Sequence, residues 1–150
     1  MTEKEKASKL FLQGYNCSQS VFTAFAYRFD IDDETALKIS AGLGGGVGRL
    51  REVCGAVSGA AMVIGSLVSA TQGDDEENKK RNYELVREFT DRFTARNKSI
   101  ICRELLALSA NTVEPAKPDS RTAEYYKKRP CLRLVEDAAE ILMQLIEENE

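Results

Sequence analysis

The residues best suited to chemistry in this 150-residue sequence are its four cysteines, Cys17, Cys54, Cys102 and Cys131. The chain has no histidine, which excludes Cys–His and Ser–His nucleophile pairs. A metal ion could therefore be held only by Cys, Asp or Glu side chains. The candidate chemistry is that of thiolates, acting as redox groups, as nucleophiles or as metal ligands.

Each cysteine has a neighbour that could lower the pKa of its thiol, because a helix N-terminus or a nearby cation stabilises the thiolate. Cys17 follows Asn16, a candidate helix cap, and Cys54 follows Arg49 and Arg51. The other two are also next to cations, with Cys102 before Arg103 and Cys131 after Lys128 and Arg129. The alternative is that the cysteines are only small buried side chains, since 30% of the residues are charged and most positions have a cation nearby.

The spacing of the cysteines gives no local motif. No C-x-x-C pair is present, so neither a zinc knuckle nor a thioredoxin-type motif can be assigned. A common site would have to be assembled in three dimensions, with one cysteine from each of four helical segments. Spacing neither supports nor forbids such an arrangement.

The segment GLGGGVGRLREVCGAVSGAAMVIG, residues 42–65, resembles nucleotide-binding loops only superficially. A dinucleotide fingerprint needs glycine at the sixth position after a strand, but counting from Gly42 or Gly44 gives Val47 or Arg49 there. A Walker loop needs a Gly-Lys pair, and the sequence has none. Backbone amides at the start of the following helix could still bind a phosphate, but close helix packing explains the glycines better.

Residues 53–70 carry no charge and just reach the length of a membrane span. Seven of these eighteen residues are Cys, Gly or Ser, which is unfavourable for a single helix facing lipid. Gly55 and Gly59, like Ala56 and Ala60, lie four positions apart, so one face of a helix would allow a neighbouring backbone to approach closely. We therefore expect a buried central Gly/Ala-rich helix of a soluble protein, and no membrane span.

Apolar residues recur at three and four positions along the chain, which predicts an all-α fold in one compact multi-helix domain over residues 1–150. Thr2 and Glu5 fit a capping box, and Asn16 and Asp32 or Asp33 fit helix caps. The expected helices cover residues 3–14, 17–29, a stretch through 34–40, 52–70, 76–96, a short stretch near 102–108, and 131–148. Residues 109–121 are expected to form a loop, because they contain two prolines.

Two of these helices are expected to have apolar faces. In the 76–96 helix the face contains Tyr83, Val86, Phe89 and Phe93. An exposed apolar face on the 131–148 helix would favour a homodimer.

The net charge of -3 offers no basic surface for nucleic acid. The N-terminus lacks a secretory signal, so we expect a cytoplasmic protein with reduced thiols.

Four segments, YNCSQSVF, AGLGGGVGRLREVCGAVSGAAMVIG, CRELL and CLRLV, resemble the redox-active protein family named C-GCAxxG-C-C after its cysteine pattern. The resemblance extends over nearly the whole chain and implies that the four cysteines are the redox or ligand residues. It also singles out Cys54, Gly55, Ala56 and Gly59 as one motif, although the family's name writes Gly before Cys and here Val53 precedes Cys54. Family members are often encoded near transporter genes, which implies a redox or transporter-associated partner.

Three functions remain open. The first is a redox protein that cycles between dithiol and disulfide, with Cys54 as the attacking thiolate beside Arg49 and Arg51. The second is a four-thiolate site for an iron–sulfur cluster or, less favoured, for zinc, with all four cysteines as ligands. The third is a non-catalytic helical interaction module in which the cysteines only pack.

Overall fold

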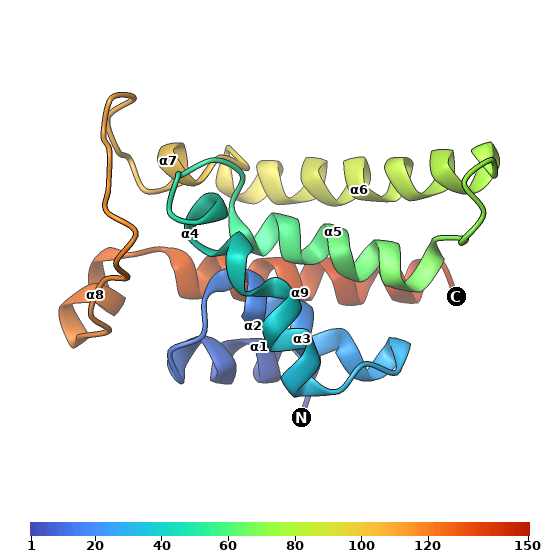
Figure 1. Cartoon of the computed structure of the whole chain (residues 1–150), viewed down its shortest axis with the longest axis horizontal. Coiled ribbons are helices and arrows are strands. Elements are labelled where there is room, and N and C mark those ends of the chain that lie inside the picture. Colours follow the sequence, from blue (N-terminus) through green and yellow to red (C-terminus); the bar gives the residue numbers. More distant parts are fainter.

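The computed structural model describes residues 1–150, and helices with connecting turns form the whole chain (Figure 1). The all-α expectation is confirmed. The helices are α1 (Glu3–Leu12), α2 (Cys17–Phe25), α3 (Asp33–Ser40), α4 (Gly44–Val47), α5 (Gly55–Val68), α6 (Glu76–Asn97), α7 (Cys102–Leu105), α8 (Ala123–Lys128) and α9 (Cys131–Glu148). Two 3₁₀ turns, Ala26–Phe29 and Ala41–Leu43, extend α2 and α3.

Side-chain caps fix where the first helices begin. The Thr2 hydroxyl accepts from the Glu5 amide while the Glu5 carboxylate accepts from the Thr2 amide, which is the predicted capping box. Asn16 forms a second capping box with Gln19 and so begins α2 at Cys17. Asp32 caps α3. Because free amides remain in the first turn of a helix, the cap at Asn16 places the Cys17 side chain at the positive end of α2.

Helix α5 is the central element and packs against α2, α6 and α9. Most of its residues up to Ile64 are buried, which confirms the buried Gly/Ala-rich helix. The helix begins at Gly55 and not at the expected residue 52. Arg51 has a left-handed φ of 62°, and Val53 pairs with Ile101 in an isolated antiparallel bridge. No helix of the chain is long and apolar enough to cross a membrane.

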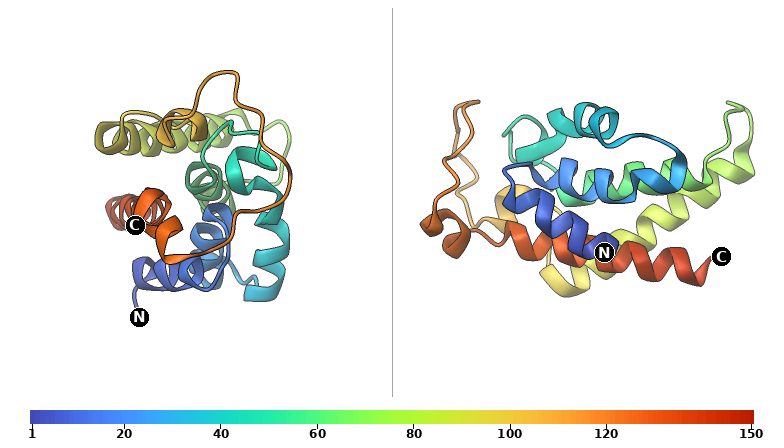
Figure 2. Two further views of the ribbon diagram at one scale, coloured as in Figure 1. Left: turned by 90° about the vertical axis from the view of Figure 1, so that its left-hand side faces the viewer. Right: turned by 90° about the horizontal axis from the view of Figure 1, so that it is seen from below.

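Helix α9 lies between α1 and α6 (Figure 2). Its expected bounds are confirmed, but the expected exposed apolar face is not, because its apolar stripe is covered. The buried residues of this stripe are Leu134, Val135, Ala138, Ile141, Leu142 and Leu145. The argument for a homodimer from this face therefore fails.

The structure differs from the expectation at Tyr83 and at the short helix α8. Phe89 and Phe93 on α6 are buried as predicted, but the Tyr83 side chain is 66% exposed. This part of α6 extends beyond the core, towards the turn that joins it to α5 (Figure 1). The expected loop 109–121 is confirmed, whereas the short helix α8 after it was not predicted. Thr122 caps α8 by accepting from the Tyr125 amide.

Candidate functional site

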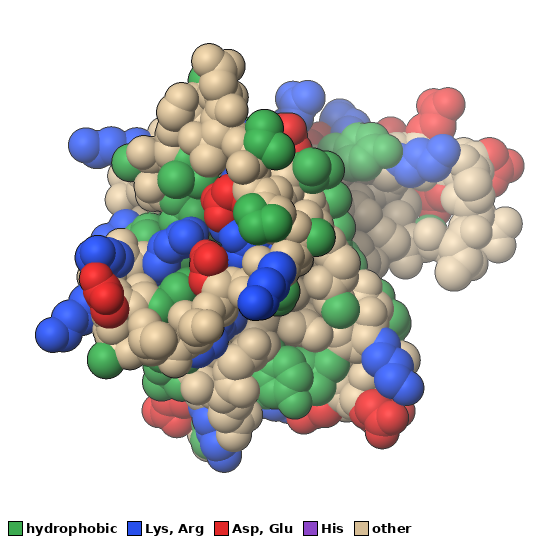
Figure 3. Space-filling model, turned by 60° about the vertical axis from the view of Figure 1, so that its left-hand side comes forward, with side chains coloured by type: hydrophobic (Ala, Val, Ile, Leu, Met, Phe, Trp, Pro, Cys, Tyr) green, Lys and Arg blue, Asp and Glu red, His purple; other side chains and the backbone are tan.

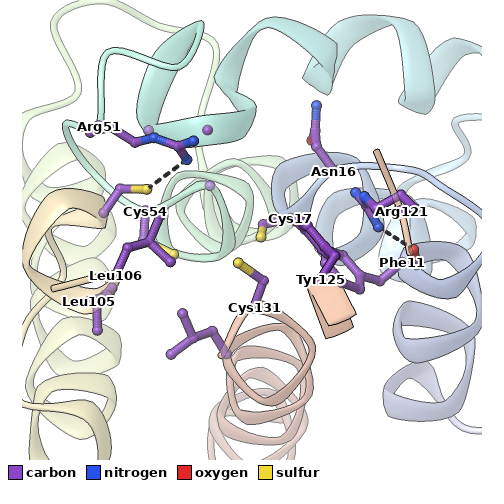
Figure 4. Close-up of a pocket in the computed structure, with 15 residues that line it drawn as sticks. Phe11, Asn16, Cys17, Arg51, Cys54, Leu105, Leu106, Arg121, Tyr125 and Cys131 are labelled. Atoms are coloured by element: carbon purple, nitrogen blue, oxygen red, sulfur yellow. Dashed lines mark hydrogen bonds between the residues drawn. The ribbon is translucent and has the colours of Figure 1, made fainter. Parts of the chain in front are cut away.

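All four cysteines lie at the N-terminal ends of helices, and these ends meet at one end of the molecule (Figure 1). Cys17, Cys102 and Cys131 are the first residues of α2, α7 and α9, and Cys54 immediately precedes α5. All four line a single cavity of about 60 Å³ (Figure 4). Four segments far apart in the sequence therefore bring their thiols to one place, and all four thiols are free.

Cys54 and Cys102 are placed by backbone pairing of two short segments. The Cys54 amide donates to the Ile100 carbonyl at 2.8 Å, and the Cys102 amide donates to the Glu52 carbonyl at 2.6 Å. These bonds flank the bridge between Val53 and Ile101. The start of α5 and the start of α7 are thus fixed against each other through their backbones.

The glycine-rich segment forms a left-handed turn over residues 45–49, where five consecutive residues have φ between 55° and 70°. Val47 and Arg49 are the two non-glycine members, and each such conformation costs about 1 kcal/mol or more. Gly46 cannot be replaced without a clash, because a Cβ there would lie 2.8 Å from the Cys102 Cβ and 2.6 Å from the Glu52 amide nitrogen. The turn therefore packs its backbone directly against Cys102.

The glycines of the Cys54 motif let α5 approach α2. A Cβ on Gly55 would lie 3.2 Å from the Cys17 Cβ, and one on Gly59 would lie 3.0 Å from the Ser18 carbonyl oxygen. Ala56 is fully buried between them. The small residues at these spacings therefore allow the close helix contact that brings Cys54 beside Cys17.

The two arginines of the glycine-rich segment have different contacts. The Arg51 guanidinium is buried and donates through Nη1 to the Cys102 Sγ at 3.6 Å. Both arginines bind the Glu114 carboxylate, Arg51 Nε at 2.7 Å and Arg49 Nη2 at 2.5 Å. The sequence suggested that both lie near Cys54. The structure places Arg51 on Cys102, and Arg49 on Glu114 and Asp119.

The surroundings of Cys131 and Cys17 lower the pKa of the first thiol and raise the pKa of the second. A hydrogen bond from the Cys17 thiol, with help from the Arg129 charge and the Tyr125 hydroxyl, outweighs burial and lowers the pKa of Cys131 to about 7. The same hydrogen bond keeps the proton on Cys17 and raises the pKa of its thiol. In Figure 4 the sulfur atoms of Cys17 and Cys131 point toward each other.

The other two thiols are less ready to ionise. Burial raises the pKa of Cys54 to about 12, although backbone amides of α5 partly offset this effect. Burial also raises the pKa of Cys102 despite its hydrogen bond from Arg51. This order favours Cys131 as the thiolate at neutral pH, where the sequence had suggested Cys54.

Several residues of the site were not identified from the sequence. Tyr125 and Arg121 line the cysteine cavity, and Arg121 lies over the Phe11 ring with its guanidinium carbon 4.2 Å from the ring centre. Arg121 also donates to the carbonyls of Phe11 and Tyr15. No local pattern in the sequence indicates these contacts, because they join residues more than a hundred positions apart.

No group of three or more Cys, Asp or Glu side chains is arranged to hold a metal ion. In this structure the cysteines share one cavity but do not form a ready ligand set.

Comparison with known proteins identifies the family of this chain. No curated protein and no solved structure matches it. A family model matches residues 15–145, a region that contains all four cysteines and the left-handed turn. The family's name writes Gly-Cys-Ala, whereas the chain has Cys54 before Gly55 and Ala56. The chain belongs to the family described as "Putative redox-active protein (C_GCAxxG_C_C)".

Proposed function

We propose that the chain is a single-domain thiol–disulfide redox protein in which Cys131 attacks and Cys17 resolves. The observation that supports this most directly is that the Cys17 and Cys131 side chains, which start α2 and α9, point their sulfur atoms toward each other in one cavity (Figure 4). The pKa of Cys131 is lowered and that of Cys17 is raised. A thiol that is ionised at neutral pH next to one that is protonated is the arrangement that disulfide exchange requires. A reducing compartment such as the cytoplasm would keep the pair in its dithiol form.

The proposed reaction has two exchange steps. The Cys131 thiolate attacks one sulfur of a substrate disulfide, a bond forms between them, and the other substrate sulfur leaves as a thiolate. The Cys17 sulfur then attacks Cys131 Sγ, the mixed disulfide breaks, and the second substrate thiol leaves with the proton from Cys17. The substrate disulfide gains two electrons, and the Cys17–Cys131 pair loses two.

Cys54 and Cys102 have a supporting role in this proposal. Cys102 is easier to ionise than Cys54, because Arg51 donates directly to its sulfur. Both thiols are protonated at neutral pH, since burial raises the pKa of each. They line the same cavity as the reactive pair.

The test is to find which cysteines become joined. Reduced protein is treated with bis(2-hydroxyethyl) disulfide, trapped with an alkylating agent, digested and mapped by mass spectrometry. A Cys17–Cys131 disulfide that dithiothreitol reverses is the expected product. The Cys54→Ala and Cys102→Ala variants should still form it, whereas Cys17→Ala should stop at the mixed disulfide on Cys131. A disulfide that joins Cys54 to Cys102, with Cys17 and Cys131 still free, would contradict the assignment.

A four-thiolate site for an iron–sulfur cluster or zinc is the second candidate, supported by the presence of all four cysteines around one cavity. Anaerobic purification followed by an absorption spectrum and metal analysis separates it from thiol exchange. Stoichiometric iron and sulfide that all four Cys→Ala variants lose would favour this candidate. If the four variants change only stability, the cysteines serve packing, as in an interaction module.

A further inference from the structure

A second cavity, of about 280 Å³, adjoins the cysteine cavity and is lined by four arginines. These are Arg49, Arg51, Arg121 and Arg129, and we call the cavity the arginine pocket. The two cavities share lining residues, namely Asn16, Gly45, Arg51, Arg121 and Tyr125. A ligand in the arginine pocket is therefore next to the thiols. Figure 3 shows Lys and Arg side chains gathered on one face of the molecule, with acidic side chains among them.

The positive charge of the arginine pocket is only partly neutralised. Glu114 binds both Arg49 and Arg51, and Asp119 binds Arg49 at 3.4 Å and Arg129 at 3.0 Å. Two carboxylates thus face four guanidinium groups.

Two of the arginines are not fully paired with acidic groups of the protein. Arg121 has no carboxylate partner, because its guanidinium donates only to backbone carbonyls. The Arg49 Nε is buried and has no hydrogen-bond partner, which is unfavourable by roughly 1–3 kcal/mol. The Arg49 positive charge is therefore not fully matched by the protein's own acceptors.

The pocket also contains an apolar wall. Arg121 stacks on Tyr125 as well as on Phe11, at 5.1 Å and 4.2 Å from the ring centres. Tyr125 lines both cavities, so its ring is next to the arginines and to the thiols. A ligand that passes from one cavity to the other would have an acidic end among the arginines and a short apolar stem along the Tyr125 ring.

We infer that the arginine pocket binds a carboxylate of the redox substrate, which is a small disulfide bearing acidic groups. This inference rests on the proposed function. Arginine presents a planar fork of donors that fits a carboxylate, and the volume suits a small organic acid better than a nucleotide. The substrate sulfur reaches Cys131 while its acidic group remains among the arginines. The sulfur exchange follows the two steps of the proposed reaction.

Three dialkyl disulfides of similar size and different charge test this inference. They are 3,3′-dithiodipropionate, bis(2-hydroxyethyl) disulfide and cystamine, with two negative charges, no charge and two positive charges. The rate of Cys17–Cys131 disulfide formation is measured with each compound. Each rate is then divided by the rate at which the same compound exchanges with a small reference thiol. We expect the anionic disulfide to exceed the neutral one by about tenfold and the cationic one to be slowest. Added salt should reduce the difference.

The Arg49→Gln variant identifies the pocket as the cause. Glutamine keeps the Cβ, so the left-handed backbone at this position has the same strain, and Arg49 contacts no cysteine. The ratio of the anionic to the neutral rate should fall about tenfold, and Arg49→Lys should recover part of it. Arg87→Gln, which removes the same charge from an exposed position on α6, should leave the ratio as in the wild type.

A non-reactive isostere separates failure of the inference from failure of the proposed function. Suberate has the shape of dithiodipropionate with two methylenes in place of the sulfurs, and its binding to reduced protein is measured by calorimetry. Suberate binding that Arg49→Gln weakens, together with the charge order above, supports the inference. Equal normalised rates for the three disulfides and no suberate binding overturn it while leaving the proposed function intact. Suberate binding without any disulfide exchange overturns the substrate assignment together with the proposed function.

Discussion

Cys131 and Cys54 both stand at the start of a helix, yet their surroundings move their pKa values in opposite directions. The helix N-terminus favours a thiolate at both positions. At Cys131 a hydrogen bond from Cys17 and the charge of Arg129 add to this effect. At Cys54 burial dominates and no cation contacts the sulfur. The reactivity of each thiol is therefore set by contacts within a few ångströms and not by its place in a helix alone.

The lowered pKa of Cys131 gives the first prediction. The rate of Cys131 alkylation by iodoacetamide should rise with pH with a midpoint near 7, since the pKa is lowered to about 7. In Cys17→Ala the midpoint should move up towards the ordinary thiol value of about 8.5, because the donor to the thiolate is gone. Mass spectrometry of the Cys131 peptide over a pH series measures both. A wild-type midpoint already at the ordinary value would contradict this interpretation.

The raised pKa of Cys54 gives a prediction about stability. Burial raises the pKa of Cys54 to about 12 in the folded protein. The contribution of this thiol to the free energy of unfolding is therefore fully present below the ordinary thiol pKa, and it is lost as the pH rises towards the pKa of the folded protein. The free energy of unfolding should fall by up to about 1.4 kcal/mol per pH unit from this group alone.

Urea unfolding at pH 7.5, 9 and 10.5 compares the wild type with Cys54→Ala. The variant should lose less stability between the first and the last pH, because it lacks this thiol. Lysines and tyrosines titrate in both proteins, so the difference between the two isolates Cys54. If the two proteins lost the same free energy of unfolding over this pH range, burial would not raise the pKa of Cys54.

At the scale of elements, sequence reasoning worked where a helix is defined by its own residues. The caps Thr2, Asn16 and Asp32 and the bounds of α9 follow from local patterns, and the structure has them as expected. The start of α5 was wrong by three residues, because it depends on pairing with residues near Ile101. No local pattern indicates that pairing.

Helix α5 contains two kinds of glycine, one packed closely against α2 and one with room for a side chain, and their replacement should have opposite effects. A Cβ on Gly59 would lie 3.0 Å from the Ser18 carbonyl oxygen, so Gly59→Ala must push the helices apart. We expect a loss of about 1–3 kcal/mol in the free energy of unfolding. Gly65→Ala adds a Cβ at ordinary contact distances of 3.7 Å and should gain up to about 1 kcal/mol from helix propensity. Urea unfolding measures both, and equal effects would argue against close packing at Gly59.

The left-handed turn provides a matched pair of substitutions near the thiols. Gly46 and Gly48 both have positive φ, at 70° and 55°, so alanine is strained at either position. Only at Gly46 would the added Cβ collide with the Cys102 Cβ and the Glu52 amide. Gly46→Ala should therefore destabilise the protein more than Gly48→Ala and increase alkylation of Cys102. Equal alkylation of Cys102 in the two variants would show that the turn does not position this thiol.

At the scale of the whole molecule, the site exists only because distant segments meet. The cysteine cavity is lined by residues from Phe11 to Leu134, and the ion pairs of Glu114 tie the long loop before α8 to the glycine-rich turn. The sequence identified the four cysteines and Arg51, but it could not show that Arg51 binds Cys102 or that Arg121 stacks on Phe11. These contacts depend on how the helices pack, and the spacing of residues in the sequence does not predict that packing.

The same long-range assembly predicts that oxidation stabilises the fold. A Cys17–Cys131 disulfide would link the starts of α2 and α9 and close a loop of more than one hundred residues. Loops of this length restrict the unfolded chain strongly, and a gain of about 2–4 kcal/mol in the free energy of unfolding is expected. Urea unfolding of reduced and oxidised protein measures the gain. Cys102→Ala should keep it and Cys17→Ala should lose it. If the oxidised wild type were no more stable than the reduced form, and if Cys17→Ala still formed an intramolecular disulfide, Cys17 and Cys131 would not be the redox pair.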